Sequence, residues 1–320
     1  MAQVIGLGEI CIDWTIRVKR FPQVDEKVYI VERKMLPGGV VANFTVGIAM
    51  LGASVAFIGG IGKDTHGKFL VNSLKKKGID TRLTLLRSNP TAINIIIVDE
   101  TGERQIYMDP YLKLNVPSFE EIKNGLDSML AGAKVLHTSA IRLDTAILTA
   151  RFAKRKGIKV TFDLEKHVAE EYGLKELKPL LELTDILMPN KMGLRTLMQM
   201  ESIIEAAKEV MKYGPSTVVV TMGERGSLIV HEDKVIETSA FKIKPIDTTG
   251  AGDAFNAGFV YAYLILGLDL REASLVANAV AALKCMRLGA QAGMPKVEEV
   301  EKFLRERGYA VSLSCSSDPK

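Results

Sequence analysis

Short apolar runs alternate along the chain with longer segments in which apolar residues recur at helical spacing. The short runs, rich in Val and Ile, predict buried strands at residues 4–8, 55–59, 135–137, 160–163, 186–188 and 217–221. The periodic segments predict helices at residues 41–51, 67–77, 119–130, 145–156, 203–213, 253–266, 270–287 and 297–307. This alternation is typical of an α/β fold with a parallel sheet flanked by helices.

Two stretches break this rhythm. They contain four strand-like segments without intervening helices, at residues 13–18, 27–35, 92–99 and 104–107. We expect a small antiparallel sheet built from about residues 13–36 and 91–109. Because a sheet with one apolar face must cover something, we interpret it as a lid over an active site. A decorative pair of hairpins and a dimer contact are the alternatives.

The composition is that of a globular protein, with 320 residues of which 47% are hydrophobic and 25% are charged. We expect one large domain over residues 1–320, with a frayed polar tail at residues 312–320. The net charge of +4 comes from 42 basic and 38 acidic residues that are interspersed along the chain. Because no basic face is concentrated enough for a polyanion, we expect no nucleic-acid partner.

The sequence also predicts a cytoplasmic protein without a membrane partner. The chain enters a strand pattern directly after Met-Ala-Gln, without a basic leader. The apolar segment after Asn256 is shorter than the roughly 18–20 residues that a bilayer span needs. Cys11, Cys285 and Cys315 are widely spaced and form no CxxC pair, which argues against a disulfide framework and a zinc site and favours a reducing compartment.

Three glycine-rich stretches compete as nucleotide-binding motifs. Residues 6–11 begin like a dinucleotide fingerprint, but Cys11 stands where the third glycine belongs. Residues 62–69 have the spacing of a P-loop, but Phe69 replaces the Ser or Thr whose hydroxyl would hold Mg²⁺. The third stretch, residues 247–258, reads DTTGAGDAFNAG and combines an anion site with a base.

In this third stretch, glycines stand directly before a predicted helix. The main-chain N–H groups of Gly250, Ala251 and Gly252 are therefore unpaired and can bind a phosphate that carries developing negative charge. Asp253 lies in the first turn of the same helix, where it can take a proton from a hydroxyl group that attacks phosphorus. The alternative is that Asp253 only caps the helix.

Other segments offer groups that suit a polyol and a nucleotide. Residues 37–43 again place glycines ahead of a helix, and Asn43 can both donate and accept hydrogen bonds with hydroxyl groups. Asp13 follows the first strand and can accept a hydrogen bond from the same polyol. Residues 221–226 follow an apolar strand, in the position where an open α/β sheet binds a nucleotide.

With these motifs the sequence resembles the ribokinase-like (PfkB) carbohydrate kinases over nearly its whole length. The motifs that carry the resemblance lie at residues 8–13, 38–43, 220–226, 247–253 and 278–295. The resemblance implies a three-layer α/β/α domain with a β-sheet lid. It also implies ATP as phosphoryl donor, Mg²⁺ on the ATP phosphates, and an alcohol group of a small sugar or related compound as acceptor.

The resemblance further implies roles for individual residues. The base would be Asp253, and the anion hole would consist of Gly250, Ala251 and Gly252. The acceptor would be bound by Asp13, Gly39 and Asn43. The residues near ATP would be Asn190, Thr221, Gly223, Gly226 and Asn278. A monovalent cation such as K⁺ would lie at Asp247 and Thr249, with the loop of residues 284–293.

The sequence departs from the family pattern at three places. Gly193 stands where the family commonly has the Glu of an Asn-x-x-Glu motif, so Mg²⁺ must rely on water, Asp247 or another carboxylate. Residues 136–140 lack the Glu that often touches ribose in ribokinases proper. Tyr107 is followed by Met108 and Asp109, not by the Tyr-x-Arg pattern of 2-keto-3-deoxygluconate kinases.

The sequence therefore predicts an ATP-dependent transfer of a phosphoryl group to the hydroxymethyl group of a small neutral sugar, ribose- or fructose-like. A nucleoside acceptor such as inosine, guanosine, adenosine or cytidine is an alternative, which a stacking role for Trp14, Phe44 or Tyr107 would favour. A non-catalytic sugar- or nucleotide-binding relative is another. An exposed apolar lid also predicts a homodimer formed through it.

Overall fold

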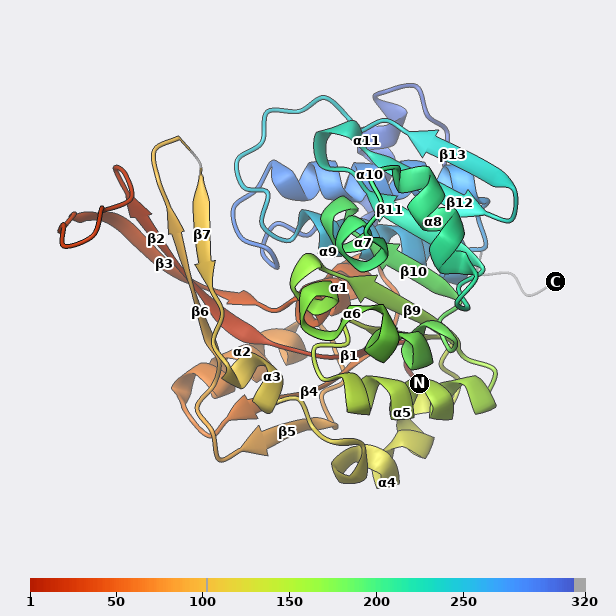
Figure 1. Cartoon of the computed structure of the whole chain (residues 1–320), viewed down its shortest axis with the longest axis horizontal. Helices are drawn as coiled ribbons and strands as arrows, with labels where there is room; N and C mark the ends of the chain where they lie inside the picture. The colour runs from red at the N-terminus through yellow and green to blue at the C-terminus, as the bar shows by residue number, and fades with distance from the viewer. Residues whose placement is uncertain (102, 314–320) are drawn as a thin grey trace.

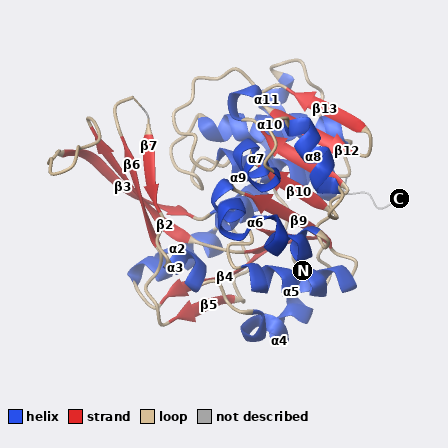
Figure 2. Cartoon of the chain, in the orientation of Figure 1, coloured by secondary structure: helices blue, strands red, loops and turns tan. Residues whose placement is uncertain are grey.

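The computed structural model of the chain describes residues 1–101 and 103–313. Within these residues, the strands form one nine-stranded sheet and one four-stranded sheet (Figure 1). Helices surround the larger sheet, and the smaller sheet projects away from the body of the molecule (Figure 2). The site lies where these two parts of the chain adjoin.

The larger sheet contains the six strands that the sequence predicts, and three more. Its members are β1 (Val4–Leu7), β4 (Val55–Gly62), β5 (Thr84–Arg87), β8 (Val135–Thr138), β9 (Lys159–Leu164), β10 (Ile186–Pro189), β11 (Thr217–Thr221), β12 (Ser227–His231) and β13 (Lys234–Thr238). They lie in the order β13-β12-β11-β10-β9-β8-β1-β4-β5. Pairing is parallel from β11 to β5 and antiparallel for β12 and β13.

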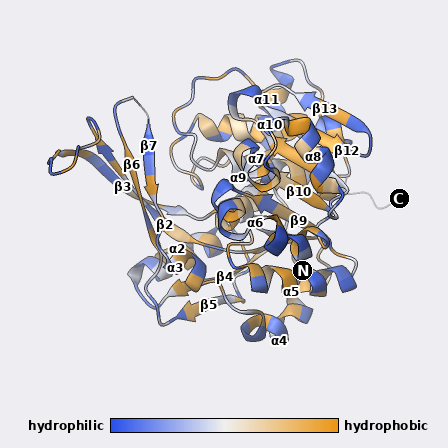
Figure 3. Cartoon of the chain, in the orientation of Figure 1, coloured by the Kyte–Doolittle hydropathy of each residue, from blue (hydrophilic) through white to orange (hydrophobic). Residues whose placement is uncertain are grey.

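Helices cover both faces of this sheet, as the sequence predicts. One face packs against α1 (Val40–Met50), α2 (Thr65–Lys76), α9 (Ala251–Val260), α10 (Leu270–Cys285) and α11 (Val297–Arg305). The other packs against α4 (Phe119–Leu130), α5 (Leu143–Arg155), α6 (Lys166–Leu181), α7 (Lys191–Met198) and α8 (Ile203–Met211). Alternate strand residues enter the two cores, as Val4 and Ile5 do in β1. Apolar residues gather in the central strands (Figure 3). The three-layer α/β/α prediction is confirmed.

Two of these helices are absent from the predictions, and a third is divided. The helix α6 contains Gly173 in a non-helical conformation, and Pro179, which together interrupt the apolar periodicity. The helix α7 has only eight residues, too few for a clear period. The predicted helix at residues 253–266 consists of α9 and a π-helical turn, η2 (Tyr261–Ile265). Two further short helices are α3 (Tyr111–Leu114) and η1 (Gly223–Arg225).

The smaller sheet is mostly antiparallel and contains the four predicted strands. It consists of β2 (Cys11–Val18), β3 (Ile30–Gly38), β6 (Ile93–Val98) and β7 (Arg104–Tyr107), in the order β3-β2-β6-β7. The central pair, β2 and β6, is parallel, which differs from the expectation of a fully antiparallel sheet. Both strands leave the larger sheet in the same direction, one after β1 and the other after β5, so they run side by side.

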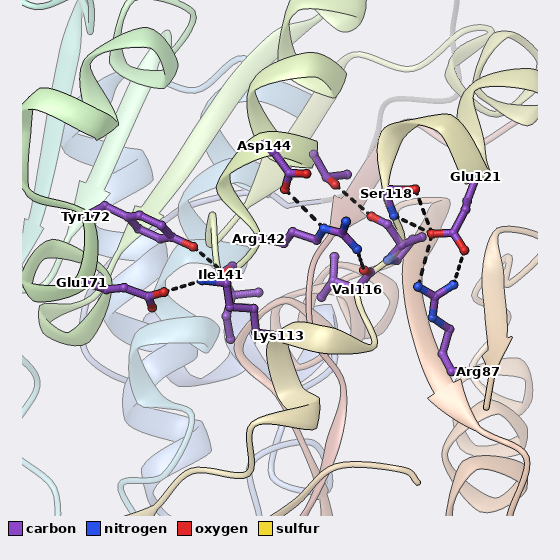
Figure 4. Close-up of polar contacts among 12 residues, drawn as sticks. Arg87, Lys113, Val116, Ser118, Glu121, Ile141, Arg142, Asp144, Glu171 and Tyr172 are labelled. Atoms are coloured by element: carbon purple, nitrogen blue, oxygen red, sulfur yellow. Dashed lines mark hydrogen bonds and ion pairs between the residues drawn. The ribbon is translucent and has the colours of Figure 1, made fainter. Parts of the chain in front are cut away.

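Polar contacts hold the segment that returns from the smaller sheet to the larger one (Figure 4). Arg142 Nη1 donates a hydrogen bond of 2.8 Å to the carbonyl oxygen of Val116. Arg87 of β5 forms an ion pair with Glu121 of α4, and Glu121 also closes the capping box of that helix. Residues 111–121 are thereby fixed against β5 and α5.

The packed chain continues beyond the start of the predicted tail. The sequence predicts fraying from residue 312, but Leu313 is fully buried and its carbonyl oxygen accepts a hydrogen bond of 2.9 Å from the Tyr261 hydroxyl. Residues 314–320, which include Cys315, lie outside the described residues. In the described part of the chain, no helix has both the length and the apolar character to cross a membrane.

Candidate active site

Polar side chains gather at the carboxyl edge of the larger sheet. Glu9 follows β1, Ser139 follows β8, Glu165 follows β9 and Asn190 follows β10. In an open α/β sheet, ligands bind at this edge. The smaller sheet begins beside it, because β2 starts two residues after Glu9 (Figure 1).

The helix α9 begins with a glycine in a left-handed conformation. Gly250 has φ of 78° and ψ of 12°, and a Cβ at this position would lie 2.8 Å from the Cβ of Ala290. A Cβ at Gly252 would have no atom within 4 Å. The N–H groups of a first helical turn have no partner inside the helix and carry the positive end of its dipole. The Ala251 N–H donates a hydrogen bond of 3.1 Å to the carbonyl oxygen of Thr248. The main chain at Gly250 and Gly252 is therefore the part of this helix start that is accessible to an anion.

The carboxyl group of Asp253 lies buried beside this helix start. Asn43 Nδ2 donates a hydrogen bond of 2.7 Å to Asp253 Oδ2. The helix cap is Gly250, and no side chain caps it, so the alternative in which Asp253 only caps α9 does not fit. Asn43 reaches Asp253 from α1, whose cap Gly39 has φ of 98°. A Cβ at Gly39 would lie 2.7 Å from the carbonyl oxygen of Glu9, so only glycine allows α1 to start there.

Burial raises the pKa of Asp253 well above its ordinary value. The negative charges of Glu165, Glu9 and Asp13 act in the same direction, while the hydrogen bond from Asn43 opposes them. A carboxylate in this setting holds a proton more strongly than a free one, which suits a general base. Asn43 and Asp13, both predicted for the acceptor, are therefore connected to Asp253. Asn43 is connected by its hydrogen bond, and Asp13 by the effect of its charge.

Two further carboxyl groups near Asp253 belong to the end of β9. Asp163 Oδ2 accepts a hydrogen bond of 2.8 Å from Asn256 Nδ2 of α9. Burial raises the pKa of Asp163 well above its ordinary value, and the charges of Glu165 and Asp253 add to this effect. Burial also raises the pKa of Glu165, against the charge of Arg104 in β7. The sequence interpretation gave neither residue a role, although acidic residues at the end of a predicted strand were a usable signal.

Glu9 brings a carboxyl group to the end of β8, where residues 136–140 offer none. Ser139 Oγ donates a hydrogen bond of 2.7 Å to Glu9 Oε2. Burial raises the pKa of Glu9, and the hydrogen bond from Ser139 opposes the shift. Ala140, which follows, has φ of 59°, a left-handed conformation that is unusual for alanine. The chain thus turns sharply at this corner of the site.

Asp13 lies on the inner face of the smaller sheet. Its Oδ1 accepts hydrogen bonds from Cys11 Sγ at 3.4 Å and from Asn94 Nδ2 at 3.5 Å. A Cβ at Gly38 of the neighbouring strand would overlap the Asp13 carboxylate, so a side chain there would displace this carboxylate from its present position. Burial raises the pKa of Asp13, and the two hydrogen bonds oppose the shift. Arg104 shares this inner face, because Asp13 pairs with Asn94 and strand residues alternate between faces.

The residues predicted for ATP meet around the carboxyl end of β11. Asn190 forms a parallel bridge with Thr221, and its Oδ1 accepts a hydrogen bond of 2.7 Å from the Gly193 N–H at the start of α7. A Cβ at Gly193 would press on the main chain of Leu164 and lie 3.1 Å from the carbonyl carbon of Glu165. A glutamate side chain at residue 193 would therefore start against the main chain of residues 164 and 165.

The other three predicted residues follow β11 or lie against it. Gly223 and Gly226 have positive φ values of 61° and 93° and form the turn from β11 into β12. Asn278 Nδ2 of α10 donates a hydrogen bond of 2.9 Å to Ser227 Oγ, directly after this turn. The structure thus brings the predicted nucleotide residues together.

Asp247 is held on several sides. Its Oδ1 accepts a hydrogen bond of 2.9 Å from the Thr249 N–H, and its Oδ2 accepts one of 2.8 Å from the Gly289 N–H. Burial raises the pKa of Asp247, but these bonds and the charge of Lys284 outweigh it, so that the net pKa is lowered. Lys284 Nζ donates a hydrogen bond of 2.8 Å to the main-chain carbonyl oxygen of Asp247. Lys284 is a residue that the sequence interpretation named only as the start of a loop.

A multi-ligand metal centre does not explain this site. Among residues 1–101 and 103–313, no group of three or more His, Cys, Asp and Glu side chains is arranged to hold a metal ion. Mg²⁺ commonly uses one or two carboxylates together with substrate phosphates and waters. Glu165, whose main chain lies next to Gly193 and whose charge raises the pKa of Asp253, could supply one such carboxylate.

Two surface cavities lie away from Asp253. One of 620 Å³ lies against α11 and residues 308–312, and one of 350 Å³ lies between α7 and the turn that contains Met222 and Arg225. Asp253 lines neither. The site is therefore identified by its buried carboxyl groups and its helix start.

The geometry places a glycine-lined helix start next to a buried carboxyl group, at the ligand-binding edge of an open α/β sheet. A family model described as pfkB family carbohydrate kinase matches residues 1–297. The chain therefore belongs to the pfkB family and is an ATP-dependent carbohydrate kinase.

Individual proteins agree with this assignment. The ribokinase of Haemophilus influenzae is 31% identical over 308 residues, which cover 93% of this chain and 97% of the relative. The crystal structure of a ribokinase from Thermotoga maritima matches with a TM-score of 0.83 at 28% identity, covering 95% of this chain and 100% of that one. A nucleoside kinase from Methanocaldococcus jannaschii matches with a TM-score of 0.78 at 25% identity, covering 96% and 99%.

Proposed function

We propose that the protein transfers the γ-phosphoryl group of ATP to the hydroxymethyl group of a small neutral sugar, ribose- or fructose-like. The observation that carries this proposal is the buried Asp253 carboxyl group, held by Asn43 at 2.7 Å beside the glycine-lined start of α9. That arrangement provides a base and an anion site next to each other.

In the proposed reaction, Asp253 accepts the proton of the attacking hydroxyl group. The hydroxyl oxygen forms a bond to the γ-phosphorus, and the bond between that phosphorus and the bridging oxygen of ADP breaks. The N–H groups of Gly250 and Gly252 stabilise the negative charge on the phosphoryl group, and Ala251, whose N–H donates to the Thr248 carbonyl oxygen, holds the turn between them. A general base of this kind contributes about 10²–10⁴-fold in rate.

The acceptor lies, in this proposal, between Asp13, Gly39 and Asn43. Asn43 Oδ1 is buried and has no hydrogen-bond partner among the described residues, so it can accept a bond from a sugar hydroxyl. Asp13 can accept another. The acidic surroundings, with Glu9, Asp13 and Asp253, favour a neutral acceptor over an anionic one.

ATP binds, in this proposal, around the end of β11, at Asn190, Thr221, Gly223, Gly226 and Asn278. Mg²⁺ would neutralise the ATP phosphates, with Glu165 as the carboxylate in place of the Glu missing at residue 193. A monovalent cation at Asp247 and Thr249 stays a prediction of the sequence. We also propose a cytoplasmic location, in keeping with the free buried thiols Cys11 and Cys285.

The side-chain directions favour a sugar over a nucleoside. Phe44 is fully buried and stacks on His137, with ring centroids 3.6 Å apart. Trp14 and Tyr107 both lie beside Ile95 in register, on the face of the smaller sheet opposite to Asp13. None of the three aromatic rings that would favour a nucleoside is directed at the acceptor position.

The same outer face supports a homodimer in which the smaller sheet acts as lid and contact. Trp14, Ile95 and Ile97 are half-buried there, and Tyr107 is 56% exposed. A half-exposed apolar sheet face is a surface that a second copy can cover.

A panel of acceptors tests the proposed reaction. ADP formation is measured with Mg·ATP and ribose, fructose and related neutral sugars, with inosine, guanosine, adenosine and cytidine, and without acceptor. We expect turnover that depends on a neutral sugar. Turnover with nucleosides alone would replace the acceptor class, and no turnover with any compound would favour the non-catalytic alternative.

A further inference from the structure

A lysine ammonium group is buried next to the anion site. Lys284, in the last turn of α10, has no exposed side-chain surface. Its Nζ lies 2.8 Å from the carbonyl oxygen of Asp247 and 3.8 Å from Asp247 Oδ2. Burying an ammonium group costs several kcal/mol unless charge and hydrogen bonds compensate for it. Asp247 provides both a hydrogen-bond acceptor and a negative charge.

Asp247 starts the segment that leads into α9. The Ile246 and Asp247 N–H groups donate to the carbonyl oxygen of Cys285, at 2.8 Å and 3.1 Å. Three residues later, Gly250 packs against Ala290. The end of α10 and the loop after it therefore support the main chain of residues 246–250, and Lys284 supplies positive charge at this contact.

The donors around Asp247 leave little for a monovalent ion. Its carbonyl oxygen accepts from Lys284, and its two carboxylate oxygens accept from the N–H groups of Thr249 and Gly289. A potassium ion needs several such oxygens free at once. These residues therefore do not fit the ion that the family resemblance implies for Asp247 and Thr249.

We propose that the ammonium group of Lys284 takes the place of that monovalent cation and positions residues 247–250 for phosphoryl binding at the start of α9. Lys284 is then a positioning residue, which acts through Asp247 and touches neither substrate. The carboxylates of Asp247 and Asp253 both favour its charged form, against the effect of burial, which lowers its pKa. The expected effect on kcat rests on the proposed function, whereas the support of residues 247–250 by Lys284 does not.

The first test is the response of the unaltered protein to cations. Sugar phosphorylation is compared in KCl, NaCl and tetramethylammonium chloride at equal ionic strength. Because the positive charge is built into the chain, we expect kcat to be the same in all three. Activation by K⁺ over tetramethylammonium would overturn the proposal.

The second test removes the built-in charge. In Lys284→Ala, the space left by the side chain can admit a small cation. We expect the melting temperature of this variant to be higher in KCl than in tetramethylammonium chloride. The unaltered protein and Lys212→Ala, a control at an exposed residue, should each melt at the same temperature in both salts. We also expect kcat to fall about 10–100-fold, the usual range for groups that orient a site, and to recover in part with K⁺ or NH₄⁺.

The two readouts separate the proposals. The melting temperature requires no substrate, so it tests Lys284 even if no acceptor is phosphorylated and the proposed function fails. Equal melting temperatures of Lys284→Ala in K⁺ and tetramethylammonium would contradict the inference. If Lys284→Ala does not fold, two other measurements test the proposal. One is the cation response of the unaltered protein, and the other is the kcat of Lys284→Met, a variant that keeps the apolar stem but leaves no space for an ion. A Lys284→Met protein with unreduced kcat would overturn it.

Discussion

At the scale of single residues, the site is a set of buried carboxyl groups that share little compensating charge. Burial and mutual repulsion raise the pKa values of Asp163 and Asp253 above the ordinary range. The folded protein therefore binds these protons more tightly than the unfolded chain does. Such groups contribute stability below their unfolded pKa, and this stability is lost as pH rises through the folded pKa. The site is costly to the fold at the pH at which its base must be ionised.

The change Asp163→Asn tests this cost. An amide keeps an oxygen for the hydrogen bond from Asn256 but carries no charge. We expect the melting temperature to rise at pH 8, with the gain shrinking as the buffer is made more acidic. Asp127→Asn serves as control, because Asp127 is largely exposed and pairs with Lys156. This change should alter the free energy of unfolding by no more than about 0.5 kcal/mol, so the melting temperature should stay nearly constant. A lower melting temperature of Asp163→Asn at pH 8 would contradict the electrostatic account.

At the scale of elements, the start of α9 joins two glycines with different tasks. Gly250 is required by the backbone, because φ is 78° and Ala290 leaves no room for a side chain. Gly252 is helical and faces open space. The fold would therefore accept alanine as well as glycine at this position. We attribute the glycine to the need for a phosphate to approach the main chain.

The pair Gly250→Ala and Gly252→Ala separates these tasks. Gly250→Ala should destabilise the fold by about 1–3 kcal/mol in chemical denaturation, since alanine is strained at positive φ and meets Ala290. Gly252→Ala should leave stability unchanged or raise it by up to about 1 kcal/mol, because alanine favours a helix. It should nevertheless lower turnover, since the methyl group enters the phosphate position. Full activity of Gly252→Ala would place the phosphate elsewhere.

At the scale of the whole molecule, the larger sheet presents the site, and the two faces of the smaller sheet carry different residues. Asp13 and Arg104 share the inner face, whereas Trp14 and Tyr107 share the outer face. The division follows from strand alternation, so one four-stranded sheet can cover a substrate and also bind a second copy.

Introducing a charge on the outer face tests the homodimer. Sedimentation of the unaltered protein should give the mass of a dimer, and Tyr107→Glu should give a monomer, because burying an unpaired carboxylate is costly. Glu103→Gln, at the exposed residue directly before this strand, is a control that should remain dimeric. A monomeric unaltered protein would contradict the proposed contact.

The fold could be predicted from the sequence wherever one signal was strong. The six buried strands and the main helices follow from apolar periodicity, and the glycines at 39 and 250 follow from their position before a helix. The edge strand β13 and the helix α6 could not be found in this way, because β13 is only partly buried and Gly173 breaks the helical period.

The site was harder to predict where it depends on contacts between distant segments. Asn43 and Asp253 were each assigned from a local motif, but their hydrogen bond joins residues 210 positions apart. The pairing of Lys284 with Asp247 had no local signal, since a lysine near the end of a helix is ordinarily exposed. The carboxyl groups of Glu9 and Glu165 come near Asp253 only through the order of the strands in the sheet, which the sequence pattern does not reveal.

The turnover of Asp253→Asn tests whether the Asp253 carboxylate accepts the proton of the attacking hydroxyl group. Sugar-dependent ADP formation is followed for the unaltered protein and the variant at pH 8, together with the melting temperature of each. We predict a loss of kcat of at least about 10²–10⁴-fold in a variant that melts at an equal or higher temperature. A folded variant with near-normal turnover would show that another group accepts the proton.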